Sequence, residues 1–288
     1  MKIGMVRIKG KQEIIVRTSD GGVLISNILK GIRAYSDILS LIMDVGSIGV
    51  IQEKLEEYKG EYIDDPEGKL QYLPVIGNPE KIICIGLNYF SHVEEAKQTV
   101  PEFPLIFSKY NNSLEAHRST IKIPDPVKQL DYEGELGIVI GKTAVNVDQV
   151  DALDYVFGYF AGNDLSARDL QFRTSQWLLG KSSDGFFPCG PFITTADEIG
   201  NPNNLNITTK VNGRIRQNSN TSKMIFKCNY LVSYLSRYFT LKPGDIISTG
   251  TPEGVVLGLP REEQEWIKSG DIIDVSIQGI GTLSNTFA

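Results

Sequence analysis

The chain has 288 residues, a net charge of -6 at pH 7 and a sequence pI near 5.1. It contains no run of five or more Lys and Arg residues, and no stretch approaches the roughly 18 to 20 apolar residues that cross a bilayer. A nucleic-acid partner and a membrane span are therefore excluded, and we expect a cytoplasmic protein. Because Cys84, Cys189 and Cys228 lie far apart without metal-ligand spacing, we expect reduced thiols buried in a core.

The first part of the chain reads as a small unit in which strands precede helices. Two apolar-rich runs flank a turn at residues 19–22, and helical spacing begins behind Ser36, which we expect to be an N-cap. Turn residues at 64–68 and 74–79 are typical of a linker. We therefore predict a small N-terminal α+β domain over residues 1–73 and a larger domain over residues 74–288.

The larger unit consists mostly of short β-rich runs separated by glycine and proline turns. Clear examples lie at residues 81–87, 157–161, 207–211 and 272–277, and Asn212-Gly213 predicts a hairpin turn. The segment Lys242-Pro-Gly-Asp245 recurs as Lys268-Ser-Gly-Asp271, each a turn that precedes a strand. The pattern predicts a mainly β (α+β) fold, a strand-dominated roll or sandwich.

The first histidine lies in a segment that predicts a short helix. Ser91 and Glu94 form a Ser-x-x-Glu capping box, which gives Glu94 a structural role. Glu95 stands three residues beyond His92, so the two side chains share a helix face. A carboxylate beside an imidazole orients it and leaves the other ring nitrogen free to take a proton. The alternative is an ordinary surface pair; the second histidine, His117, is expected on the surface or in a loop.

Glu133 and Glu135 begin the run Asp131-Tyr-Glu-Gly-Glu-Leu-Gly-Ile-Val-Ile140, whose apolar tail predicts a strand. Residues i and i+2 of a strand point to the same face, roughly 6.5 to 7 Å apart. Two like charges held that close favour a cation between them, and a hard divalent metal is the usual one. The alternative is a solvated edge strand with two surface acids.

A third acid and a lysine follow in chain order. Asp164 comes just after a strand-like run and is flanked by Gly162 and Asn163, although it could instead cap a helix. Three carboxylates suit Mg2+ or Mn2+, and the lack of a His or Cys cluster argues against zinc or copper. Lys181 is either a surface ammonium or a buried cation facing anions. It does not belong to a phosphate loop, because Ser175 stands where that loop needs glycine.

From about residue 80 to its end the chain resembles the fumarylacetoacetate hydrolase family. Five motifs occur in family order: Ile85-Gly-Leu-Asn-Tyr89 with His92 and Glu95, Asp131-Tyr-Glu-Gly-Glu135, Asn163-Asp-Leu-Ser-Ala-Arg-Asp-Leu-Gln171, Gln176-Trp-Leu-Leu-Gly-Lys-Ser182, and Ser248-Thr-Gly-Thr-Pro-Glu-Gly254. The resemblance implies a mixed β-sandwich roll, usually a homodimer, and a small N-terminal unit like that of many bacterial members. It also implies these site residues: Glu133, Glu135 and Asp164 holding Mg2+ or Mn2+, Lys181 lining the metal site, Gln171 and Thr251 contacting substrate, and a His92–Glu95 dyad on a mobile lid.

One departure from the family pattern affects the expected substrate. The fumarylacetoacetate hydrolases proper carry a further acidic ligand near the position of Asn88, where this chain has no acid. The chain is more similar to members that act on acylpyruvates or oxaloacetate. We therefore expect divalent-metal-dependent cleavage of C–C bonds in small 2-oxo acids through a metal-stabilised pyruvate enolate, with the dyad activating water. The alternatives are an isomerase, tautomerase, hydratase or dehydratase at the same site, such as a 2-hydroxyhepta-2,4-diene-1,7-dioate isomerase, and a non-catalytic binding protein.

Overall fold

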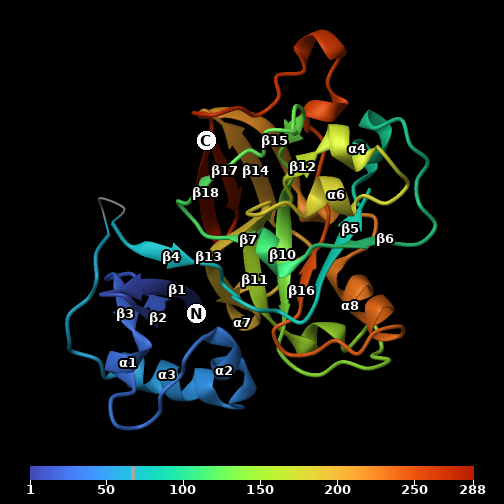
Figure 1. Ribbon diagram of the computed structural model, residues 1–288. Coiled ribbons are helices and arrows are strands. Elements are labelled where there is room, and N and C mark those ends of the chain that lie inside the picture. The colour runs from blue at the N-terminus through green and yellow to red at the C-terminus, as the bar shows by residue number, and fades with distance from the viewer. Residues whose placement is uncertain (66–68) are drawn as a thin grey trace.

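The computed structural model describes residues 1–65 and 69–288 (Figure 1). The N-terminal unit has the expected order of strands before helices: β1 (Lys2–Ile8), β2 (Lys11–Arg17), β3 (Gly22–Leu24), α1 (Ile25–Ile28), α2 (Ile38–Met43), α3 (Ser47–Glu56) and β4 (Gln71–Leu73). The expected cap at Ser36 is wrong by one residue. Asp37 caps α2, because its carboxylate accepts the backbone N–H of Ser40 at 2.7 Å, while the Ser40 hydroxyl accepts that of Asp37.

The strands of this unit continue into the main sheet of the protein. That sheet runs in the order β3-β2-β1-β13-β11-β10-β16-β5-β6, with β4 on β1 and β7 on β13. Its further members are β5 (Ile82–Gly86), β6 (Leu105–Ser108), β7 (Leu114–Glu115), β10 (Gly134–Ile140), β11 (Val156–Asn163), β13 (Phe187–Thr195) and β16 (Ile246–Ser248). Because Lys2 pairs with Thr194, the division into residues 1–73 and 74–288 stays a prediction. The linker expected over 64–68 includes residues 66–68, which lie outside the described residues.

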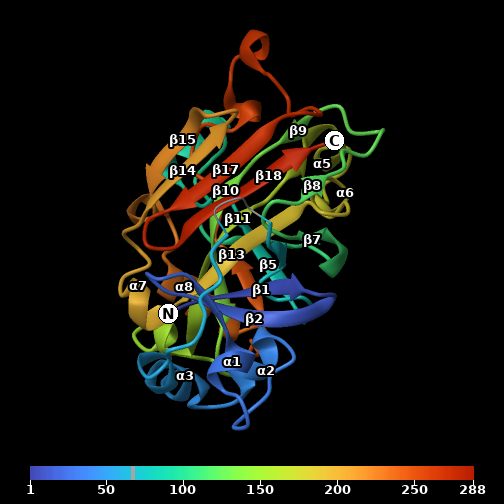
Figure 2. The ribbon, with the colours of Figure 1, turned by 90° about the vertical axis from the view of Figure 1, so that its left-hand side faces the viewer.

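A second sheet packs against one face of the first, in the order β15-β14-β17-β18-β8 (Figure 2). Its strands are β14 (Asn206–Val211), β15 (Arg214–Asn220), β17 (Ile272–Ile277), β18 (Gly281–Phe287) and β8 (Thr120–Ile121). A short ladder joins β9 (Leu130–Asp131) to β12 (Ser166–Ala167). The hairpin at Asn212-Gly213 is confirmed, since both residues have positive φ, as its tight turn requires. The sandwich of mixed sheets confirms the mainly β expectation.

The two faces of β10 bury side chains in different cores. Leu136 and Ile138 pack with Val275 of the second sheet, whereas Val139 packs with Ile3 of the N-terminal unit. The alternation follows from the two-residue period of a strand. The central strands β10 and β11 are therefore covered on both faces.

The two Gly-Asp turns have matching geometry. Gly244 and Gly270 both adopt positive φ, and Asp245 and Asp271 each accept the backbone N–H three residues earlier, at 2.7 and 2.9 Å. Each turn leads into a strand, as expected. The expectation of buried reduced thiols is confirmed for all three cysteines.

Helices outside the N-terminal unit are short and lie at the ends and edges of the sheets. They are α4 (Phe90–Glu95), α5 (Arg168–Gln171), α6 (Leu178–Lys181), α7 (Ala196–Ile199) and α8 (Cys228–Ser236). Within the described residues, no helix has the length and apolar character needed to cross a membrane.

Candidate metal centre

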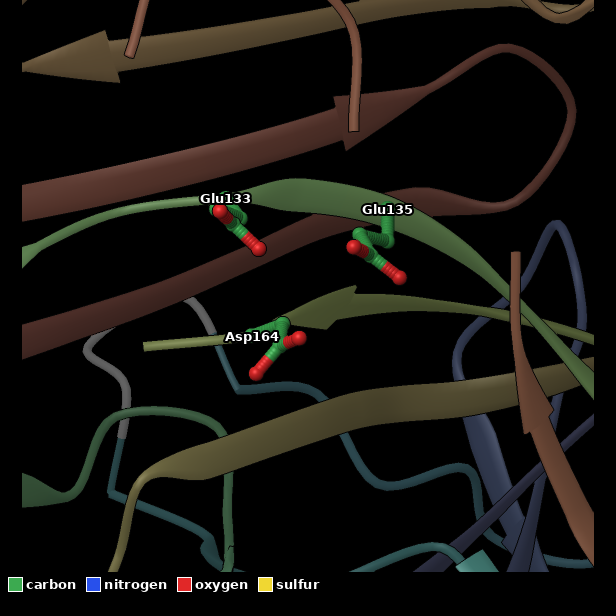
Figure 3. Close-up of side chains that lie close together, drawn as sticks. All are labelled: Glu133, Glu135 and Asp164. Carbon is green, nitrogen blue, oxygen red and sulfur yellow. The ribbon is translucent and has the colours of Figure 1, made fainter. Parts of the chain in front are cut away.

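Three buried carboxylates meet where β10 begins and β11 ends (Figure 3). Glu133 directly precedes β10, Glu135 is the second residue of β10, and Asp164 directly follows β11. Because Gly134 pairs with Asn163 in the antiparallel ladder, these ends are neighbours. One oxygen from each acid lies within 4.8 Å of the others. The alternative of an exposed edge strand is wrong, since at most 6% of any of these residues is exposed.

The backbone around the acids is held by its own hydrogen bonds. The N–H of Asp164 donates to the carbonyl of Glu133 at 2.9 Å, and the N–H of Glu133 donates to Asn163 Oδ1 at 3.0 Å. Helix α5 begins at Arg168 after Ala167, so Asp164 is not its cap. The carboxylate of Asp164 is thus free to take part in the charged centre.

Three buried cations surround the acids. Lys181 Nζ lies 2.7 Å from Glu133 Oε2 and 2.9 Å from Asp164 Oδ2. Lys109 Nζ lies 2.7 Å from Asp164 Oδ1 and donates to backbone carbonyls, including that of Phe186 at 2.8 Å. Of the two alternatives for Lys181, the buried cation facing anions is therefore the one that holds.

The third cation links the centre to a fourth acid. Arg168 Nη2 lies 2.7 Å from Glu133 Oε1, and its Nε lies 2.9 Å from Asp131 Oδ2. Sequence reasoning missed Asp131, Arg168 and Lys109. Asp131 and Arg168 lie inside the motifs that carry the family resemblance. Lys109 is a single lysine after an apolar run, a pattern that does not predict a buried charge.

The pKa values show which acid lacks a cation. Burial alone would raise the pKa of Glu133, but Lys181 and Arg168 outweigh it and lower that pKa to about 2. Burial raises the pKa of Glu135 well above its usual range, and the charges of Asp164 and Glu133 raise it further. With all four buried carboxylates ionised, as metal binding requires, the three cations leave one excess negative charge. This all-oxygen donor set with excess negative charge fits a hard divalent cation such as Mg2+ or Mn2+.

Helix α4 presents the expected His–Glu pair to the same centre. His92 Nδ1 lies 3.3 Å from Glu95 Oε2, and Glu95 also accepts the N–H of Gly254 at 3.0 Å. Glu95 is therefore fixed by the loop that follows β16. His92 is 7% exposed.

The predicted capping box at Ser91 and Glu94 is wrong. Helix α4 begins at Phe90, with Tyr89 in the cap position and no capping side chain. Ser91 thus lies inside the first turn, and its hydroxyl donates to Glu253 instead. A carboxylate distant in sequence has replaced the local partner.

A cavity of about 240 Å³ joins the dyad to the carboxylates. Its polar lining comprises His92, Gln98, Glu133, Glu135, Arg168, Gln171, Lys181 and Thr251, and its apolar wall includes Ile85, Leu105, Phe107, Trp177 and Leu257. Glu95 and Asp164 stand behind this lining. The structure therefore brings together all the residues that the sequence singled out for a site.

Three polar side chains at or near the cavity form hydrogen bonds within the protein. Gln171 Oε1 accepts from Arg168 Nη1 at 2.9 Å, and the Thr251 hydroxyl donates to the carbonyl of Gly134 at 3.0 Å. Asn88, where the family pattern led us to look for an acid, is fully buried, and its amide donates to the carbonyls of Phe226 and Thr249. Asn88 therefore has a structural role, because it connects the segment after β5 to two segments that are distant in sequence.

Comparisons with known proteins agree with this geometry. Residues 81–288 match the family model "Fumarylacetoacetate (FAA) hydrolase C-terminal". The chain is 44% identical over 218 residues to oxaloacetate tautomerase fahd2, mitochondrial, of Xenopus laevis, covering 75% of this chain and 68% of that protein.

Two solved structures are similar over the whole chain. Fumarylacetoacetate hydrolase from Exiguobacterium antarcticum has 32% identity and a TM-score of 0.83, with coverage of 100% and 99%. Maleylpyruvate hydrolase from Sphingobium sp. SYK-6, in complex with manganese(II) and pyruvate, has 28% identity and a TM-score of 0.81, with the same coverage. The protein belongs to the fumarylacetoacetate hydrolase family.

Proposed function

We propose that the protein enolises small 2-oxo acids, and that its main activity is keto–enol tautomerisation of an oxaloacetate-like acid. One observation carries the proposal: a carboxylate-oriented imidazole lines the same cavity as Glu133 and Glu135, two members of a cluster of three buried carboxylates. The volume of about 240 Å³ suits a molecule with only a few carbons. Similarity to a protein named as an oxaloacetate tautomerase supports tautomerisation in particular.

We further propose that Glu133, Glu135 and Asp164 hold Mg2+ or Mn2+. When bound there, the cation would attract the carboxylate and 2-oxo oxygens of the substrate and stabilise the negative charge of its enolate. The protein named with manganese and pyruvate supports a divalent cation at this place. With a divalent cation, the charged cluster changes from one excess negative charge to one excess positive charge, which suits an anionic substrate.

The side chains of the cavity supply the proton transfers. Glu95 accepts from His92 Nδ1, so Nε2 is left free to take a proton from C3 of the substrate and return it to the enolate oxygen. The ammonium of Lys181 stabilises the developing negative charge from the other side. The apolar wall around Trp177 and Leu257 keeps water from the enolate.

A second candidate is the C–C cleavage expected from the sequence. In acylpyruvate hydrolysis, His92 would take a proton from water as it attacks the distal carbonyl, and the products would be pyruvate and a carboxylic acid. Oxaloacetate would instead lose CO2 and leave the same pyruvate enolate. The dyad can serve these reactions as well, and the similarity to a maleylpyruvate hydrolase supports them.

One experiment separates the candidates. Purified protein with Mn2+ is mixed with oxaloacetate or acetylpyruvate, while ultraviolet absorbance reports the enol and a lactate dehydrogenase assay reports pyruvate. Tautomerisation predicts fast loss of the enol signal without pyruvate, whereas cleavage predicts pyruvate in step with substrate loss. If EDTA leaves both rates unchanged, the metal-dependent proposal is wrong.

The homodimer and the cytoplasmic location stay predictions.

A further inference from the structure

We propose that Gln217 is a positioning residue for the metal centre, which it reaches from the opposite sheet. This inference rests on the proposed function, because it concerns how the candidate ligands are held. Gln217 lies on β15 and is fully buried. It does not line the cavity, so its side chain acts only through other groups.

The backbone of Gly134 pairs with Asn163 of β11 on one side but has no strand partner on the side of β16. On one edge of β10, Glu133 bonds to Asn163 and Asp164. On the other edge, pairing with β16 starts only at Gly137, where Ser248 is the partner. The N–H and C=O of Gly134 therefore point to a place that no strand of the described residues occupies, although a buried peptide group needs a partner.

Gln217 and Thr251 replace the missing strand. Gln217 Oε1 accepts the N–H of Gly134 at 3.0 Å, and the Thr251 hydroxyl donates to the carbonyl of Gly134 at 3.0 Å. Gln217 Nε2 donates to Thr251 Oγ1 and to the carbonyl of Pro252, both at 2.8 Å. The peptide groups on both sides of Gly134 are thereby fixed, and with them the directions of Glu133 and Glu135.

The glycine between the two glutamates makes this contact possible. Glu133 and Glu135 face the cavity, so residue 134 faces the second sheet. A Cβ at Gly134 would lie 2.2 Å from Thr209 Oγ1 and 3.1 Å from Gln217 Oε1. The same Gln217 amide also holds Pro252, two residues before the Gly254 N–H that fixes Glu95. One buried side chain thus sets the relative positions of the candidate ligands and the dyad.

The test measures Mn2+ binding by calorimetry in the absence of substrate. Gln217→Met keeps the volume of the side chain but removes its acceptor and both donors, and Thr251→Val removes the hydroxyl from the same network. Groups that orient metal ligands typically change metal affinity by about 10- to 100-fold. We expect at least a tenfold weaker Mn2+ affinity for each single variant. The double variant should bind Mn2+ no more weakly than the single variant with the lower affinity, because both substitutions disrupt the same hydrogen-bond network.

Asn285→Leu is the matched control. Asn285 is also a buried amide of the second sheet, and it donates to the carbonyl of Ala116 at 2.8 Å, away from the metal centre. Its variant should lower the melting temperature and leave Mn2+ affinity unchanged. If Gln217→Met melts cooperatively and binds Mn2+ within threefold of wild type, or if Asn285→Leu weakens binding equally, Gln217 has no positioning role. If the wild-type protein binds no Mn2+, the proposed metal function and this inference both fail, whereas normal wild-type binding confines any failure to the inference.

Discussion

Lys181 bridges two acids that flank different strands: its ammonium lies 2.7 Å from Glu133, just before β10, and 2.9 Å from Asp164, just after β11. These are two of the three carboxylates proposed to hold a divalent cation. Burial would lower the pKa of Lys181, but Asp164 and Glu133 outweigh it and raise that pKa, so the lysine stays charged. Lys181 is therefore both a competitor of the cation for these acids and a source of positive charge for an anionic substrate.

Replacing Lys181 by Met separates these two roles. We expect Mn2+ affinity to stay the same or to increase, because the competing charge is gone, while kcat falls by roughly 100-fold, as for the loss of one group that stabilises the transition state. Calorimetry and steady-state kinetics measure the two effects. Lys242→Met, which removes only an exposed pair with Glu80, is the control and should change neither. A parallel loss of Mn2+ binding in the Lys181 variant would contradict the assignment.

Replacing Glu135 by Gln should have opposite effects on metal binding and on stability. The amide keeps an acceptor for the N–H of Gly250, which donates to Glu135 Oε2 at 2.9 Å. Burial, and then the charges of Asp164 and Glu133, disfavour the ionised form of Glu135, and an uncharged amide avoids this cost, so we expect the metal-free variant to be more stable by about 1 kcal/mol. Mn2+ affinity should fall at least tenfold. Urea denaturation with EDTA and a Mn2+ titration test the two parts, and a less stable metal-free variant would show that the buried Glu135 carboxyl carries no such cost.

The dyad is tested by neighbouring glutamates on α4. Glu95→Gln should lower kcat by roughly 10- to 100-fold and His92→Ala by roughly 1000-fold, because the proton-transfer group is first misdirected and then lost. Glu94→Gln changes an exposed residue of the same charge and should leave kcat unchanged. All three variants should bind Mn2+ normally. Equal effects of Glu94→Gln and Glu95→Gln would show that charge, and not orientation of His92, matters.

Much of the site could be predicted because the necessary information is local. The two-residue period of a strand places Glu133 and Glu135 on one face, and the three-residue spacing on a helix places Glu95 beside His92. Asp164 was recognised by its motif and its position after a strand. Where these segments meet in space follows from the antiparallel pairing of β10 with β11.

The features that were missed depend on contacts between distant segments. The Ser91 hydroxyl donates to Glu253, so the local Ser-x-x-Glu pattern predicted the wrong partner. Gln217 approaches Gly134 only because two sheets pack face to face, and the pairing of Lys2 with Thr194 depends on a register that no local pattern encodes. The sequence around Lys109 does not predict its burial, because its partners, Asp164 and backbone carbonyls, come from distant segments.

Outside the site, His117 should make the protein less stable in mild acid. Its Nδ1 accepts the N–H of Ser284 at 3.0 Å, so the folded protein needs this nitrogen unprotonated. Burial, together with the charge of Arg118, lowers the pKa of His117 from 6.5 to about 4. Between these pH values the unfolded chain binds a proton that the folded protein does not, so stability falls as the pH drops from 6.5 towards 4.

His117→Asn isolates this effect, because Asn Oδ1 takes the place of Nδ1 as acceptor and does not titrate. Between pH 7 and pH 5, wild type should lose about 1 to 2 kcal/mol more free energy of unfolding than the variant. Urea denaturation at both pH values measures the difference, which cancels the carboxylates common to the two proteins. Wild type and variant curves that stay parallel across this range would mean that His117 is protonated in the folded state. The hydrogen bond from Ser284 would then be broken in solution, because a protonated Nδ1 has no lone pair with which to accept it.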